Sequence, residues 1–182
     1  MRASDQRAFL RRAHVFADEL TELTGEPVHV TVYDHGTSVT VATASADVVR
    51  STDTVPIAVG SRRPAHASAS GKVFLGYNSA ALTAYLLRPL QAFTERTIVD
   101  AGELRAECAR IRARGWSTDA QENTLGVSCV AVPVWGMTDR VVGSLVVSTR
   151  QTEMSDSARE ELLGLLTPAA EEFSRAVGGA QR

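Results

Sequence analysis

The stretch that decides the fold is VSCVAVPVWGMTDRVVGSLVVST, residues 127–149. Two runs rich in β-branched residues flank a Gly-Met-Thr-Asp turn at residues 136–139. Such residues favour strands, and a short glycine-containing turn between two strand-like runs is typical of a hairpin. The sequence therefore predicts an antiparallel hairpin at the centre of a sheet.

A second strand pair is predicted nearer the N-terminus. Val28, Val30 and Val32 alternate with polar residues in VHVTVYDHG, residues 28–36, which is the pattern of a half-buried strand that ends in a turn. The following SVTVATAS, residues 38–45, is expected to pair with it. Residues 48–59 predict a less regular strand pair or a loop, with Pro56 at an edge or bulge.

Five helices are expected around these strands. The first covers residues 7–25, and the second begins near residues 68–71. The third is capped by Ser79, the fourth begins at Asp100 and ends at Gly115, and the last begins at Ser155 with a kink at Pro168. The apolar faces of the first and last helices are predicted to be Leu10, Ala13, Phe16, Ala17, Leu20 and Leu23, and Leu162, Leu166, Ala169, Phe173 and Val177.

This order of elements predicts an α+β fold with a curved, mainly antiparallel sheet flanked by helices, and not a doubly wound sheet. A length of 182 residues fits one domain with a proper core. The net charge of −2 and the aromatic content of 5% provide neither the positive field nor the rings that nucleic acid needs. Residues 1–182 are therefore predicted to be a single domain that does not bind DNA by itself.

Composition also limits the chemistry. The two cysteines, Cys108 and Cys129, lack the spacing of a zinc site or a disulfide framework, so we expect reduced thiols, a cytoplasmic protein and no metal or cofactor. No apolar run approaches the roughly 18 residues of a membrane span. The Gly71-Lys72 pair is typical of phosphate-binding loops, but such a loop needs glycine where His66 stands and a hydroxyl where Val73 stands.

Three segments occur in an order and at spacings that resemble the effector-binding domain of the IclR family of bacterial transcription regulators. They are RRPAHASASGKVFL at 62–75, RARGWSTDAQENTLGVSCVAVPV at 112–134 and RVVGSLVVST at 140–149. The resemblance runs over nearly the whole chain. It implies a fold like the GAF and profilin-like domains, with a small-molecule pocket on the concave side of the sheet, and a homodimer or homotetramer.

Family members carry a winged helix-turn-helix ahead of this domain, whereas residues 1–25 already resemble the first helix of the effector domain. We expect the chain to be a truncated piece of a regulator, with a natural stand-alone domain as the alternative. DNA would then be bound only through a winged helix-turn-helix outside this chain.

The resemblance implies a site for a small organic acid at the start of the second helix. Main-chain groups of Ala69 and Ser70, followed by Gly71, would hold the carboxylate, because the first amides of a helix have no partners within it. A simply capped helix start is the other interpretation. Asp119, Cys129 and Ser148 match the family's polar pocket residues. Without the family, a turn or helix-cap aspartate and a small buried cysteine are the commoner interpretations of the first two.

Two residues depart from the family and two are expected as apolar walls. Val146 replaces a family serine, which favours a less polar effector with an aromatic or aliphatic body in a pocket of a few hundred Å³. Arg63 replaces an apolar residue and could clamp an acid, but solvent exposure is expected because arginine is seldom buried. Val55 and Ala131 are the predicted walls.

The resemblance therefore implies a small-molecule sensor that is not an enzyme. One alternative is a hydrolase-like enzyme with Cys129 as nucleophile and His66 or Asp119 as base, but an apolar strand should raise the pKa of that thiol and leave it inert. A ligand-free oligomerisation module is another. We expect His66 to be a hydrogen-bonded loop histidine and Lys72 only to solvate its helix face.

Overall fold

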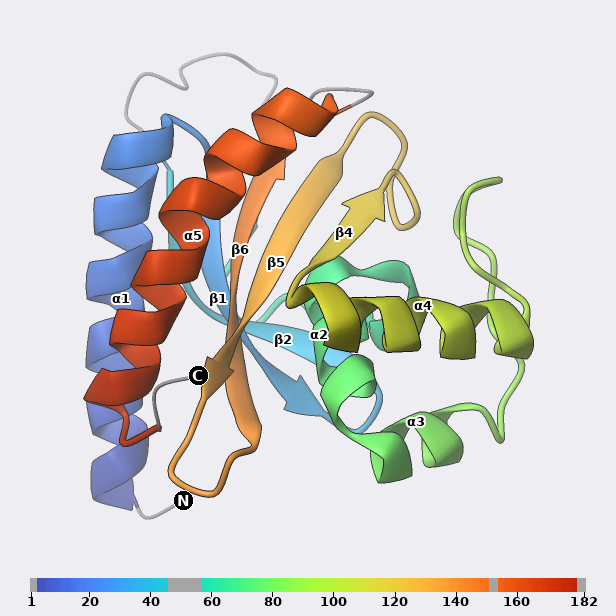
Figure 1. Cartoon of the computed structure of the whole chain (residues 1–182), viewed down its shortest axis with the longest axis horizontal. Helices are drawn as coiled ribbons and strands as arrows, with labels where there is room; N and C mark the ends of the chain where they lie inside the picture. The colour runs from blue at the N-terminus through green and yellow to red at the C-terminus, as the bar shows by residue number, and fades with distance from the viewer. Residues whose placement is uncertain (1–2, 46–56, 151–153, 180–182) are drawn as a thin grey trace.

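The computed structural model describes residues 3–45, 57–150 and 154–179. One six-stranded sheet forms its centre, in the order β3-β2-β1-β6-β5-β4, and every neighbouring pair is antiparallel (Figure 1). The strands are β1 Val28–Asp34, β2 Thr37–Ala44, β3 Arg62–Pro64, β4 Ser117–Ala120, β5 Ser128–Trp135 and β6 Val141–Thr149. The helices are α1 Ala3–Thr24, α2 Ala69–Tyr77, α3 Ser79–Tyr85, α4 Ala101–Arg114 and α5 Asp156–Ala176.

The predicted hairpin is β5 and β6, with Val130 opposite Val147. Strand β6 lies beside β1 at the centre of the sheet, so the position expected for the hairpin is confirmed for β6, and β5 lies one strand further out. The strand pair β1 and β2 is also confirmed. The predicted α+β class with a mainly antiparallel sheet is therefore correct.

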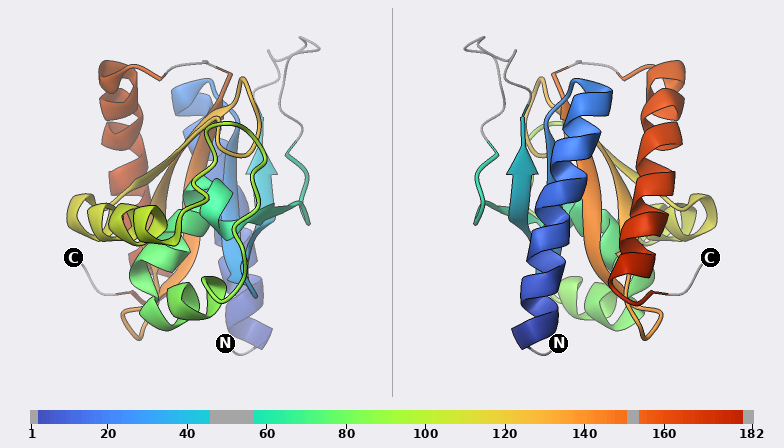
Figure 2. Two further views of the ribbon diagram at one scale, coloured as in Figure 1. Left: turned by 90° about the vertical axis from the view of Figure 1, so that its right-hand side faces the viewer. Right: turned by 90° about the vertical axis from the view of Figure 1, so that its left-hand side faces the viewer.

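The two faces of the sheet differ in what covers them. Helices α1 and α5 lie side by side on one face, with α2, α3 and α4 on the other side (Figure 2). Successive side chains of a strand point to opposite faces of the sheet, so every second residue faces α1 and α5. Val28, Val130 and Val147 are buried in this way. On the other face, α2 packs Val73 against Val146.

Several sequence predictions need correction. Leu10 and Leu23 are exposed, and Phe9 instead stacks on Phe173 with the ring centroids 5.1 Å apart. The cap of α3 is Asn78, whose side chain accepts from the amide of Ala81. The helix α5 continues through Pro168 without interruption, and the kink expected there stays a prediction. The segment predicted at 48–59 lies largely outside the described residues, and β3 follows it.

Other helix ends are as predicted. Asp100 caps α4 by accepting from the amide of Glu103 at 2.8 Å, and Gly115 ends the helix in the left-handed conformation with φ 89°. Ser155 caps α5. The last helix buries Leu166 and Phe173 as expected.

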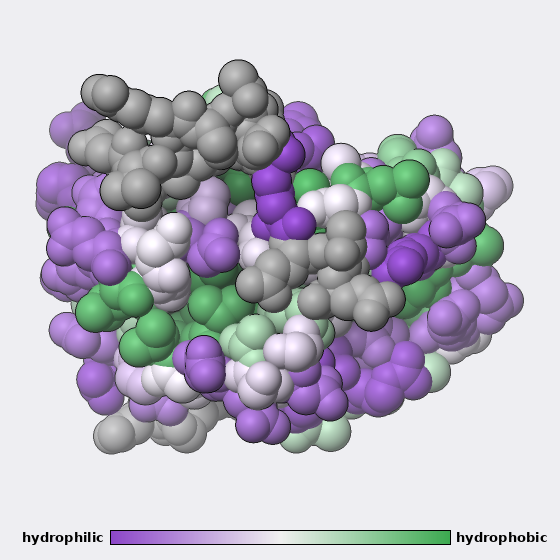
Figure 3. All heavy atoms as spheres, turned by 90° about the horizontal axis from the view of Figure 1, so that it is seen from above, coloured by the Kyte–Doolittle hydropathy of each residue, from purple (hydrophilic) through white to green (hydrophobic). Residues whose placement is uncertain are grey.

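The surface seen from above carries hydrophobic side chains on both its left and its right half, with hydrophilic side chains between them (Figure 3). Within the described part of the chain, no helix combines the length and the hydropathy that a membrane crossing requires.

Candidate functional site

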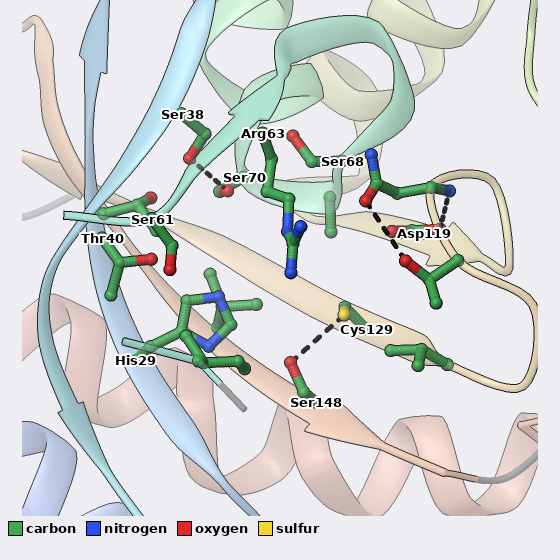
Figure 4. Close-up of a pocket in the computed structure, with 17 residues that line it drawn as sticks. His29, Ser38, Thr40, Ser61, Arg63, Ser68, Ser70, Asp119, Cys129 and Ser148 are labelled. Carbon is green, nitrogen blue, oxygen red and sulfur yellow. Dashed lines mark hydrogen bonds between the residues drawn. The ribbon is translucent and has the colours of Figure 1, made fainter. Parts of the chain in front are cut away.

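A cavity lies between the start of α2 and the face of the sheet that α1 and α5 leave free (Figure 4). Its free volume is about 50 Å³, which is smaller than the few hundred Å³ expected from the sequence. The space suits a ligand of few non-hydrogen atoms. The residues that line it are His29, Thr31, Ser38, Thr40, Ile57, Ser61, Arg63, Ser68, Ala69, Ser70, Asp119, Asn123, Thr124, Val127, Cys129, Val146 and Ser148.

Three of the predicted residues form a row across neighbouring strands. Asp119 on β4 pairs with Cys129 on β5, and Cys129 pairs with Ser148 on β6. Residues directly opposite one another in a sheet place their side chains on the same face. The Cys129 Sγ atom lies 3.2 Å from Ser148 Oγ. The register of the sheet thus brings together residues that are up to 29 positions apart in the sequence.

Asp119 is buried at one end of the cavity. Its Oδ1 atom accepts from the amides of Glu122 at 2.6 Å and of Asn123 at 3.4 Å, which fixes the turn after β4. Burial, followed by the nearby Glu122 carboxylate, raises the pKa of Asp119 from 3.8 to about 7. Near neutral pH the carboxyl group therefore exists in both forms, and it can either donate to a ligand or accept from one.

The start of α2 forms another wall of the cavity. Ser68 caps the helix, and its Oγ atom accepts from the amide of Gly71 at 3.3 Å. Ser70 Oγ lies 2.6 Å from Ser38 Oγ on β2. No side chain of the described residues accepts from the amides of Ala69 or Ser70. These amides and the helix dipole favour an anion in the cavity.

Not every predicted residue lines the cavity. Gly71 packs against the backbone before α2, where a Cβ atom would lie 2.3 Å from Ala65 Cα, so its role is close packing. Ala131 is fully buried beneath α2, whereas Val146 lines the cavity. Val55 lies outside the described residues.

The prediction that Arg63 points to solvent is wrong. The side chain is half-buried and extends into the cavity between His29 and Cys129 (Figure 4). Its neighbour Arg62 points to the surface, where Nη2 lies 2.6 Å from Asp34 Oδ2. Arg63 has no ion pair with any described residue, so its guanidinium brings an uncompensated positive charge to the cavity.

Sequence reasoning missed two residues of β1 that line the cavity. His29 is opposite Val146 of β6, and Thr31 is opposite Ser144. His29 Nδ1 and Thr31 Oγ1 are buried and have no hydrogen-bond partner among the described residues. Burial, with a smaller contribution from the charge of Arg63, lowers the pKa of His29 to about 3, so the ring is neutral at physiological pH. The only signal in the sequence was their alternation with Val28 and Val30, which places them on the face away from the core.

Lys72 is not solvated, contrary to expectation. The side chain is 1% exposed, and its Nζ atom forms an ion pair with Glu122 Oε1. The pair joins α2 to the turn that follows β4, and it thereby fixes two walls of the cavity relative to each other.

His66, by contrast, is the hydrogen-bonded histidine that was predicted, with Nδ1 2.6 Å from Tyr85 Oη and Nε2 2.9 Å from the Gln91 carbonyl oxygen.

The geometry does not support nucleophilic catalysis by Cys129. Burial, with the charge of Asp119 in second place, raises the pKa of the thiol to about 12. The thiolate is the reactive form of cysteine, and at neutral pH it is not populated here. The hydrogen-bond partner of Cys129 is the hydroxyl of Ser148, which is no general base at this pH.

Comparison with known proteins agrees with the fold. Residues 1–175 match the family model described as the bacterial transcriptional regulator IclR C-terminal domain. The HTH-type transcriptional regulator XynR of Escherichia coli is 31% identical over 170 residues, or 92% of this chain, and the chain spans 66% of the length of XynR. The IclR protein of Thermotoga maritima superposes with a TM-score of 0.86 at 28% identity, covering 93% of this chain and 68% of that one.

A further solved structure shares the fold at lower identity. It is the inducer-binding domain of PobR from Acinetobacter, a double mutant in complex with 3-hydroxybenzoic acid, with a TM-score of 0.81 and 24% identity over 90% of this chain and 96% of that one. The curated relatives are transcriptional regulators and not enzymes. The match over nearly its whole length shows that the chain belongs to the IclR family of bacterial transcriptional regulators and corresponds to their C-terminal, effector-binding domain.

Proposed function

We propose that this chain senses a small carboxylic acid with an aliphatic or aromatic body, and that the acid changes how copies of the chain associate. The observation that carries the proposal is the guanidinium of Arg63, which has no ion pair with a described residue and lies in a cavity that the start of α2 also lines. Guanidinium groups and helix N-termini both favour anions, and a planar carboxylate matches the paired donors of arginine.

The opposite end of the cavity supplies the polar contacts that would orient such an acid. Asp119 can donate or accept, and Ser148 and Cys129 lie beside it in the row across the strands. In PobR, a domain of the same fold holds 3-hydroxybenzoic acid. This precedent supports a carboxylic acid as the class of ligand.

Regulation would follow from a change in assembly. In this proposal the chain forms homodimers or homotetramers, and DNA is bound by winged helix-turn-helix segments outside residues 1–182. A ligand shifts such an equilibrium only when it binds one arrangement better than the other. Sedimentation velocity with and without a bound acid tests this step, and identical profiles would contradict it.

The ligand site is tested by titration calorimetry with benzoate and propionate, and with benzamide and propionamide as uncharged controls. Arg63→Met keeps the apolar stem and removes the charge, so we expect the affinity for whichever acid binds to fall by about tenfold or more, the usual effect of losing a charged hydrogen bond. The matched control is Arg62→Met on the same strand, which removes a surface arginine and should leave the affinity unchanged. Equal loss in both variants, or equal binding of acid and amide, would contradict the proposal.

A further inference from the structure

Two polar side chains of β1 line the cavity with no protein partner among the described residues. His29 is 8% exposed and Thr31 is 2% exposed, and the unpartnered atoms are His29 Nδ1 and Thr31 Oγ1. Burying a polar group without a hydrogen bond lowers the stability of the folded state, so native proteins contain few such groups. Two in one cavity wall, on consecutive outward positions of one strand, indicate a ligand that completes their hydrogen bonds.

The chemistry of these atoms limits what that ligand can be. A neutral imidazole carries one donor and one acceptor, and Nδ1 has either role according to the tautomer. The threonine hydroxyl also donates and accepts. A hydroxyl group of a ligand satisfies both residues in either tautomer, whereas an aromatic or alkyl body satisfies neither.

We propose that His29 and Thr31 form a hydroxyl-binding subsite, so that the ligand is a short hydroxylated carboxylic acid. This inference rests on the proposed function, because Arg63 beside His29 would hold the carboxylate of the same molecule. The subsite places the hydroxyl near the carboxylate, as in 2-hydroxy and 2,3-dihydroxy acids.

The rest of the lining agrees with this class of ligand. Ser38, Thr40 and Ser61 add hydroxyl groups on the same side of the cavity as His29 (Figure 4). The free volume of about 50 Å³ suits a compact molecule better than a benzoate ring. The replacement of a hydroxyl by Val146 had favoured a less polar ligand, but this single residue is outnumbered by polar residues from β1, β2 and β3.

The test compares three probes by titration calorimetry: D-glycerate, propionate and benzoate. D-Glycerate and propionate differ only in two hydroxyl groups, so their affinity ratio measures hydroxyl recognition. We expect D-glycerate to bind at least about tenfold more tightly than propionate, as for one or two buried hydrogen bonds. Thr31→Val and His29→Leu should each reduce this ratio severalfold.

Thr21→Val is the matched control. Thr21 also carries a buried hydroxyl that has no partner among the described residues, and it lies on α1, which covers the other side of the sheet. Replacing an unpartnered hydroxyl by a methyl group of the same shape should leave both threonine variants at least as stable as the parent, so a lost ratio in Thr31→Val cannot be ascribed to unfolding.

The outcomes separate the two proposals. Tighter binding of benzoate or propionate than of D-glycerate, or an unchanged ratio in Thr31→Val, would overturn the hydroxyl subsite and leave the acid sensor standing. Failure of all three acids to bind would overturn the acid sensor and the subsite with it.

Discussion

At the scale of single residues, Asp119 links the site to pH. Its pKa is about 7 in the folded chain, against an ordinary value of 3.8, because burial disfavours the charged form. Between these two values the folded state holds a proton that the unfolded state releases. The contribution of Asp119 to stability is therefore fully present below about pH 4 and is lost as the pH rises to about 7.

Asp119→Asn should remove this dependence. The amide oxygen of asparagine can still accept from the amide of Glu122, so the turn is kept. We expect the free energy of unfolding of the variant, relative to the parent, to increase by up to about 1.4 kcal/mol per pH unit between pH 5 and 6.5. Urea denaturation of both proteins at several pH values measures the difference between their free energies of unfolding. Groups that titrate alike in the two proteins cancel in this difference. A difference that stays constant with pH would show that Asp119 titrates normally.

Some residues of the site could be predicted from the sequence and others could not. Asp119, Cys129 and Ser148 lie in contiguous motifs, so the resemblance placed them together. The direction of the Arg63 side chain depends on the pairing of β3 with β2, in which Arg63 is opposite Ser38. The general tendency of arginine to be exposed predicted a side chain in solvent instead. The burial of Lys72 depends on Glu122, fifty positions away, and no local pattern reveals that contact.

At the scale of elements, the ion pair between Lys72 and Glu122 connects α2 with the turn after β4. The main-chain oxygen of Glu122 also accepts from Thr97 Oγ1 at 2.6 Å, so the loop before α4 is attached to the same point. Since the amide of Glu122 binds Asp119, a shift of this turn would move the carboxyl group in the cavity. The pair therefore acts as a positioning device for two opposite walls.

Removing one member of this pair should be costly. Lys72→Met leaves the buried Glu122 carboxylate without its cation, and we expect a loss of about 3–5 kcal/mol in the free energy of unfolding. The double variant Lys72→Met, Glu122→Gln should recover a large part of that loss, because it removes the uncompensated charge. Urea denaturation of the two single variants and the double variant gives the coupling directly.

The surface pair of Arg62 and Asp34 serves as the comparison, with a cost below about 1 kcal/mol for Arg62→Met. Additive losses would contradict the coupling.

Helices and hairpins were predictable because their periodicity is local. One exception is β4, whose four residues Ser117–Ala120 show no strand-like alternation of apolar side chains. It forms a strand because it pairs with β5, with Ser117 opposite Ala131 and Ala120 opposite Ser128. This strand therefore depends on tertiary contacts and not on local propensity. Strand β4 carries Asp119. The family resemblance therefore identified this residue, but no pattern in the sequence predicted the strand that positions it.

At the scale of the whole molecule, the sheet separates two tasks. The face under α1 and α5 is apolar and packed, with Phe16 stacked on Phe173 at 4.8 Å between ring centroids, and it supplies the stability. The opposite face carries buried polar groups that cost stability and are suited to a ligand. The sequence predicted this layered class of fold, but not the small size of the cavity, because volume depends on how side chains from six strands and a helix meet.

The division of tasks predicts how the whole chain responds to a ligand. A molecule that binds only the folded state at a hundred times its Kd adds about 2.7 kcal/mol to the free energy of unfolding. In a domain of this size, 1 kcal/mol raises the Tm by about 2–4 °C, so a saturating acid should raise it by about 5–11 °C. Arg63→Met should keep the Tm of the unliganded chain, since Arg63 has no ion pair among the described residues to lose, and should lose most of the shift. Differential scanning calorimetry measures both quantities. A shift of equal size in the variant would mean that the acid binds elsewhere, because a ligand held by Arg63 cannot stabilise the chain to the same extent without it.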